Sequence, residues 1–198
     1  AGDVILILGA GDVDIIADGG ATFRIIVGKY GSGKSFLLQT IRNYAMDRNF
    51  VVVDADLSPE RRLQGSHGQG LATYKELIRN MSTKTRPEGG ALTLILDRWI
   101  SGVQQDVLAE GLEPGTEAFA QRVEMRIHEV VGTLSELVHG FDFAQLLVMY
   151  YRAYVNDDED TKAKVVNWFR GECANKTEAR NELGIRIIDE DEFRAMLE

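Results

Sequence analysis

The N-terminal third of the chain alternates short apolar runs with one longer amphipathic segment. Residues 23–27 and 50–56 are apolar and rich in β-branched side chains, which is typical of buried strands. Between them, residues 36–46 place apolar side chains three and four positions apart, which predicts an amphipathic helix. Residues 4–8 form a further apolar run, which we interpret as a lead-in lying against this segment. The order strand, helix, strand predicts a βαβ unit with parallel strands.

From residue 91 onward the chain has almost continuous helical periodicity, interrupted by short polar segments. Residues 156–160 form one such break and are expected to cap the helix that follows. Asp142 is the expected N-cap of the helix that runs to Tyr154. Helices are predicted over residues 71–80, 91–111, 116–140, 142–154, 165–172 and 176–183.

Residues 28–35 read Gly-Lys-Tyr-Gly-Ser-Gly-Lys-Ser and lie between the first predicted strand and helix. They fit the pattern G-x-x-x-x-G-K-[ST] of a phosphate-binding loop. Glycines permit positive φ and leave no Cβ between the backbone and a ligand. Successive N–H groups and the helix N-terminus can then attract phosphate oxygens. The predicted nucleotide-binding residues are Gly28, Lys29, Tyr30, Gly31, Ser32, Gly33, Lys34, Ser35 and Phe36.

Two side chains of this loop have the chemistry that a magnesium nucleotide needs. Lys34 would bring a positive charge to the β- and γ-phosphates, and Ser35 would offer its hydroxyl to Mg²⁺. A chance glycine-rich turn is the alternative, but the flanking strand and helix are the context that this motif requires. The sequence therefore predicts a nucleoside triphosphate site, with ATP and Mg²⁺ as cofactors.

Together these patterns predict an α/β P-loop NTPase fold, with a parallel sheet core and a large helical portion. Residues 1–90 form the expected nucleotide-binding α/β part. Residues 91–198 form a mostly helical part, which we expect to continue into the rest of the ATPase domain in a longer parent chain.

Hydrolysis also needs an acidic residue that holds Mg²⁺ from the end of another strand. Asp97 and Asp189 follow apolar runs, but Asp97 lies within helical periodicity and Asp189 opens an acidic helix start. Asp54 and Asp56 end the second predicted strand, where a solvated strand end is the commoner arrangement. We assign no catalytic residue and expect the hydrolytic acid to lie beyond residue 198. This chain alone would then hydrolyse ATP weakly or not at all.

Composition narrows the class of protein. A net charge of −9 argues against a surface that coats nucleic acid broadly. No apolar run approaches the length of a membrane span, and the chain begins without the basic segment of a secretory signal. Cys173 is the single cysteine, so an internal disulfide is impossible. We expect a cytoplasmic protein without membrane contact.

Several segments resemble one known family. ADGGATFRIIVGKYGSGKS, DADLSPERRLQG, GQGLATYKELIRN and WFRGECANKTEARNELGI are similar to segments of the ATP-binding proteins of BREX-type phage-defence systems. The resemblance runs from about residue 18 to the C-terminus. It implies an AAA+-like ATP-binding module of a bacterial defence or DNA-linked machine, with its Walker B strand following the present segment. We expect protein partners or self-assembly, with local or indirect contact to DNA as a further expectation. The Walker A residues Gly28, Gly33, Lys34 and Ser35 carry over directly.

Three function classes stay open at this point. The first is an ATPase motor or switch subunit, the second a P-loop kinase, and the third a nucleotide sensor without turnover. A kinase would need an acceptor pocket with arginines, and no such grouping is evident. Residues 161–186 are mildly basic and suit a helix-turn-helix that contacts DNA, although glutamates are interleaved as on an ordinary solvated helix.

Overall fold

The computed structural model describes residues 3–8, 23–56, 58, 69–132, 140–173 and 183. Its contacts divide the chain into two compact units. The first, here called the loop unit, consists of residues 1–52 and 83–87. The second, the helical unit, consists of residues 53–82 and 88–198. Because the chain passes between the units at three places, neither unit is continuous in sequence.

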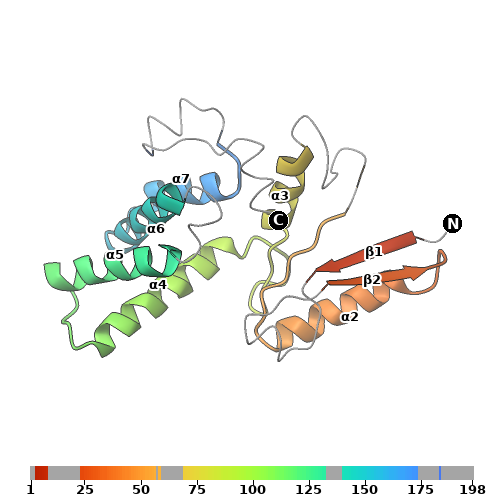
Figure 1. The fold of residues 1–198 in the computed structure, drawn as a ribbon, viewed down its shortest axis with the longest axis horizontal. Coiled ribbons are helices and arrows are strands. Elements are labelled where there is room, and N and C mark those ends of the chain that lie inside the picture. The colour runs from red at the N-terminus through yellow and green to blue at the C-terminus, as the bar shows by residue number, and fades with distance from the viewer. Residues whose placement is uncertain are drawn as a thin grey trace. The chain divides into compact units, whose positions relative to one another are not determined.

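The loop unit contains a two-stranded sheet and one helix. Strand β1 (Asp3–Leu8) pairs antiparallel with β2 (Phe23–Gly28), with Asp3 opposite Gly28 and Leu8 opposite Phe23 (Figure 1). Helix α2 (Lys34–Asp47) follows β2 after a short loop. The strand predicted at residues 23–27 and the helix predicted at residues 36–46 are therefore confirmed.

The predicted parallel sheet core of a P-loop NTPase is wrong for the part of the chain that the structure describes. The sheet there is antiparallel and has two strands, and the rest is mainly helical. Residues 50–56 form no named strand and contain one bridge residue, Val52, between the exposed side chains of Val51 and Val53. An apolar β-branched run favours extended backbone, but a strand also needs a neighbour with which to pair. The predicted βαβ unit fails for this reason.

The helical unit contains the five remaining helices of the described residues. These are α3 (Gln69–Arg79), α4 (Leu92–Ala109), α5 (Glu117–Gly132), α6 (Gly140–Val155) and α7 (Glu159–Phe169). In this unit α4 packs against α5, α5 against α6, and α6 against α7. The predicted large helical portion is confirmed, including the helical state of residues 92–97. The helix predicted at residues 176–183 lies outside the described residues, apart from Leu183.

Two predicted helix starts have different outcomes. Asp158 is the N-cap of α7, and its carboxylate accepts a hydrogen bond of 3.0 Å from the Thr161 N–H. The polar break before this helix therefore caps it as expected. Asp142 was expected to cap α6, but α6 begins at Gly140 and Asp142 lies inside its first turn. An acidic residue is favourable anywhere in a first turn, so the residue type alone does not fix the boundary.

The core of the protein lies between the helices of the helical unit. Apolar residues there repeat at helical spacing, so each helix turns one stripe inward. Tyr150, Ile100, Ile127, Leu146, Val107, Val123, Val131 and Val165 are almost completely excluded from solvent. In the loop unit, by contrast, Met46 is the buried apolar side chain among the described residues.

A polar cluster ties α4, α6 and α7 together at the edge of this core. The Tyr150 hydroxyl donates to Asp97 Oδ1 at 2.6 Å, and Lys162 Nζ lies 3.7 Å from the same oxygen. Lys162 is 9% exposed and donates to Glu159 at 2.9 Å. Burial opposes the charged form of Lys162, but the hydrogen bond to Glu159 and the charge of Asp97 outweigh it and raise the pKa of the lysine. Burial and the bond to Asp97 raise the pKa of Tyr150.

Replacing Tyr150 with phenylalanine is expected to destabilise the helical unit by about 1–2 kcal/mol, because a hydrogen bond to a partly buried carboxylate is lost. Both tryptophans, Trp99 and Trp168, lie in this unit, so urea unfolding followed by their fluorescence measures the change. The matched control is Tyr154→Phe, which removes a longer contact of 3.3 Å with the Ser101 hydroxyl. Equal effects of the two changes would contradict a special role for the Asp97 bond.

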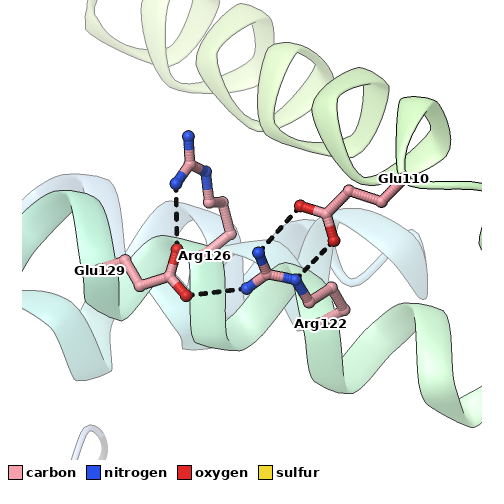
Figure 2. Close-up of polar contacts among 4 residues, drawn as sticks. All are labelled: Glu110, Arg122, Arg126 and Glu129. Atoms are coloured by element: carbon pink, nitrogen blue, oxygen red, sulfur yellow. Dashed lines mark hydrogen bonds and ion pairs between the residues drawn. The ribbon is translucent and has the colours of Figure 1, made fainter.

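An ion-pair network on the surface links the end of α4 to α5 (Figure 2). Arg122 donates to both carboxylate oxygens of Glu110, at 2.6 and 2.8 Å, and to Glu129 at 2.8 Å. Arg126 reaches the other oxygen of Glu129 at 3.0 Å. The hydrogen bonds from these arginines lower the pKa of Glu110 and of Glu129. The network fixes the orientation of exposed side chains, and such pairs contribute little to stability.

Candidate phosphate-binding loop

The loop between β2 and α2 has a backbone conformation that requires glycine at two positions. Gly31 has φ of 77° and Gly33 has φ of 83°, both in the left-handed region. A residue with a Cβ would be strained there by about 1–2 kcal/mol. Gly33 is also the N-cap of α2, so the position has no side chain that could bond the first N–H groups of the helix. The partial positive charge of a helix N-terminus favours an anion beside it.

One backbone hydrogen bond closes the turn of the loop, and another is the first bond of the helix that follows it. The Ser32 N–H donates to the Lys29 carbonyl at 3.1 Å, and the Leu37 N–H donates to the Gly33 carbonyl at 2.9 Å. A Cβ on Gly28 would lie 2.5 Å from the Ser32 hydroxyl oxygen, which shows how closely the two arms of the turn approach.

Lys34, the first residue of α2, folds back over this turn. Its ammonium donates to the Gly28 carbonyl at 3.0 Å and to the Lys29 carbonyl at 2.9 Å. These bonds hold the positive charge beside the helix N-terminus, where the partial charge of the backbone has the same sign. Within α2, all of which is described, the first turn carries no acidic residue. The electrostatic field at this point therefore favours an anion.

The predicted binding residues form one continuous segment, and most of their side chains are open to solvent. Gly28 and Lys34 are half-buried, and the others are exposed. Ser35 lies in the first turn of α2, next to the lysine. Tyr30 and Phe36 are large apolar side chains with exposed fractions of 95% and 78%. A ligand could reach every one of these groups from solvent.

A hydrolytic acid is not assigned among the described residues. The described part of the chain contains no group of three or more His, Cys, Asp or Glu residues able to hold a metal ion. Asp97 is engaged by Tyr150 and Lys162 in the helical unit. Asp54 belongs by its contacts to the helical unit, where its carbonyl accepts from Asn80 at 2.9 Å. Asp189 lies outside the described residues, and the location of the acid stays a prediction.

Sequence reasoning missed the contacts that attach residues 83–87 to α2. Arg42 donates to the Pro87 carbonyl, and the Lys84 ammonium lies 3.4 Å from Asp47 Oδ1. The end of α2 that is remote from the phosphate loop is thus connected to a short turn closed by Thr83 and Arg86. The sequence offers opposite charges at these positions but no signal for their pairing, because the partners are far apart along the chain.

The basic segment proposed as a DNA reader is described only in its first half. Lys162 is buried, and its ammonium lies 5.8 and 5.5 Å from the ring centres of Tyr150 and Tyr154. Because it is also paired with acidic side chains, it does not face solvent. Lys164 lies 2.8 Å from Asp160. The rest of residues 161–186, apart from Leu183, lies outside the described part. No helix among the described residues is long and apolar enough to cross a membrane.

The family model described as "BREX system ATP-binding protein BrxC/D" matches residues 9–198, which is nearly the whole chain. No curated protein and no solved structure matches the chain significantly.

Proposed function

Because the chain belongs to the family of BREX system ATP-binding proteins BrxC/D, we propose that residues 28–36 are its ATP-binding loop. The observation that carries the proposal is the position of the Lys34 ammonium, held by the Gly28 and Lys29 carbonyls beside the N-terminus of α2, whose N-cap residue is a glycine. An anion with several oxygens fits this arrangement better than a neutral ligand does. The backbone N–H groups of residues 29–34, except that of Ser32, which donates to the Lys29 carbonyl, would surround the phosphate tail.

The side chains of Lys34 and Ser35 would bind different parts of the magnesium nucleotide. Lys34 would neutralise charge on the β- and γ-phosphates, and the Ser35 hydroxyl would be a ligand of Mg²⁺. Mg²⁺ would supply charge neutralisation between the phosphate oxygens. It retains much of its water shell and needs few protein ligands, so one exposed hydroxyl in the first turn of α2 is a suitable contact. Ser35 is the residue of this loop that fits the role.

We further propose that this chain is an ATP-binding subunit of a BREX-type phage-defence machine. In this role it acts in the cytoplasm with protein partners or with copies of itself. Exposed apolar side chains on β2, those of Ile25 and Val27, support the expectation of partners. Apolar side chains on one face of a sheet are normally covered. The description of the family supports a role in phage defence, since it names a BREX system.

Titration calorimetry of this chain with ATP, ADP, GTP and inorganic tripolyphosphate, each with and without Mg²⁺, tests the proposal. Saturable binding of ATP and of tripolyphosphate is expected, with ATP binding tightened by Mg²⁺. Absence of binding by all four ligands at millimolar concentration would refute the loop as a polyphosphate site. Phosphate release should be slow, and turnover of about 1 s⁻¹ or faster would refute the prediction that the hydrolytic acid is missing.

A further inference from the structure

Phe36 lies on the wrong face of α2 for a core residue. The inward side of this helix carries Leu38, Ile41, Ala45 and Met46, which are half-buried or buried. At 100° per residue, Phe36 lies about 140–180° around the helix from Leu38, Ile41 and Ala45, and about 80° from Met46. It shares its own face with residues four, seven and eleven positions later, which are Thr40, Asn43 and Asp47 and are all exposed. A large apolar ring therefore stands at the start of an otherwise polar stripe.

The position of Phe36 along the helix places this ring near the phosphate-binding loop. Phe36 is the third residue of α2, and its carbonyl accepts a hydrogen bond of 2.9 Å from the Thr40 hydroxyl. Side chains of a helix lean toward its N-terminus, so the ring leans toward the end of the helix at which the phosphates would lie. Lys34 is about 3 Å away along the helix axis, at 1.5 Å per residue. Phe36 thus lies within the first turn of the helix that begins at the loop.

Resting on the proposed function, we propose that Phe36 stacks against the base of the bound nucleotide. The backbone N–H groups and the charge of Lys34 recognise phosphate, so a contact with the base is left to the exposed aromatic side chains, Tyr30 and Phe36. An exposed aromatic ring is suited to the flat face of a base, and base stacking on aromatic side chains contributes measurable affinity regardless of base identity. The ligand class is therefore a nucleoside triphosphate rather than an inorganic polyphosphate.

The proposal is tested by comparing ATP with inorganic tripolyphosphate, which has the phosphate chain and no base. Phe36→Leu keeps an apolar side chain of good helix propensity, so α2 should remain intact. Loss of stacking should weaken ATP binding roughly 5- to 100-fold. Tripolyphosphate should bind the variant and the parent chain with affinities within about twofold of each other. Calorimetry in the presence of Mg²⁺ measures both.

The matched control is Tyr44→Leu. Tyr44 is a second exposed aromatic residue of α2, eight residues further on, and its ring lies 3.5 Å beneath the Arg48 guanidinium. This variant should bind ATP as the parent chain does. If Phe36→Leu weakened the binding of ATP and of tripolyphosphate equally, the stacking role would be overturned. Unchanged ATP binding by this variant would also overturn it. A selective loss of ATP affinity in Tyr30→Leu, with Phe36→Leu unaffected, would also overturn it.

The two proposals fail in distinguishable ways. If tripolyphosphate does not bind and Lys34→Ala leaves ATP binding unchanged, the phosphate-binding loop itself is wrong. If tripolyphosphate binding depends on Lys34, but Phe36→Leu changes the affinities for ATP and tripolyphosphate by the same factor, only the stacking of the base on Phe36 is wrong.

Discussion

Replacing Lys34 with alanine is expected to weaken ATP binding by about 10- to 100-fold. The ammonium would donate charge-assisted hydrogen bonds to the β- and γ-phosphates, and bonds of this kind contribute about 1.5–3 kcal/mol each. The change also removes the two bonds to the Gly28 and Lys29 carbonyls, so the loop loses an internal tie together with its charge. Calorimetry with ATP and Mg²⁺ measures the loss.

Two controls separate the loss of the ligand contact from damage to the loop. Lys84→Ala removes one positive charge from the same unit, at a residue that pairs with Asp47, and should leave ATP affinity within about twofold. Lys34→Arg retains the charge but not the compact geometry of an ammonium, so it should restore binding only in part. Lys34→Ala that binds ATP normally would contradict the assignment of this loop.

Replacing Ile127 with alanine is expected to destabilise the helical unit by about 2–5 kcal/mol. Ile127 is fully buried in α5, among residues from neighbouring helices, and its truncation leaves a cavity that close-packed surroundings fill only in part. Urea unfolding followed by tryptophan fluorescence reports the helical unit, because Trp99 and Trp168 both lie there.

Met125→Ala is the control for the same helix. Met125 is two residues before Ile127 and is 53% exposed, so its truncation should change the free energy of unfolding by about 0.5 kcal/mol or less. Both substitutions place alanine in α5, where it has the highest helix propensity, so a difference between them reflects packing. Similar losses at the two positions would contradict the assignment of the core to the inner stripe of α5.

The features that the sequence predicted correctly are local ones. The glycines of residues 28–35 have left-handed φ at positions 31 and 33, as a phosphate-binding turn needs. Helical periodicity correctly located α4, including the run ending in Asp97 that imitates a strand. Both signals depend on residues within a few positions of one another, so they can be identified without knowledge of the rest of the fold.

The features that the sequence predicted wrongly are those that depend on distant partners. Residues 50–56 have strand-like composition but form no named strand, and the strand that pairs with β2 among the described residues is β1, which is antiparallel to it. Composition favours an extended backbone without choosing its neighbour or its direction. The βαβ unit and the parallel sheet core were therefore inferred from a pattern that does not contain that information.

By itself, the sequence determined the glycine-rich turn after β2, the helix that begins at it, and the positions of most later helices. These follow from glycine conformation and from the spacing of apolar residues, which act over one or two turns of the chain. Only the tertiary structure decided the antiparallel pairing of β1 with β2, the bond from Tyr150 to Asp97 53 residues away, and the exposure of Phe36 beside the loop. These depend on which surfaces meet when the chain folds, because pairing and burial are properties of contacts between segments.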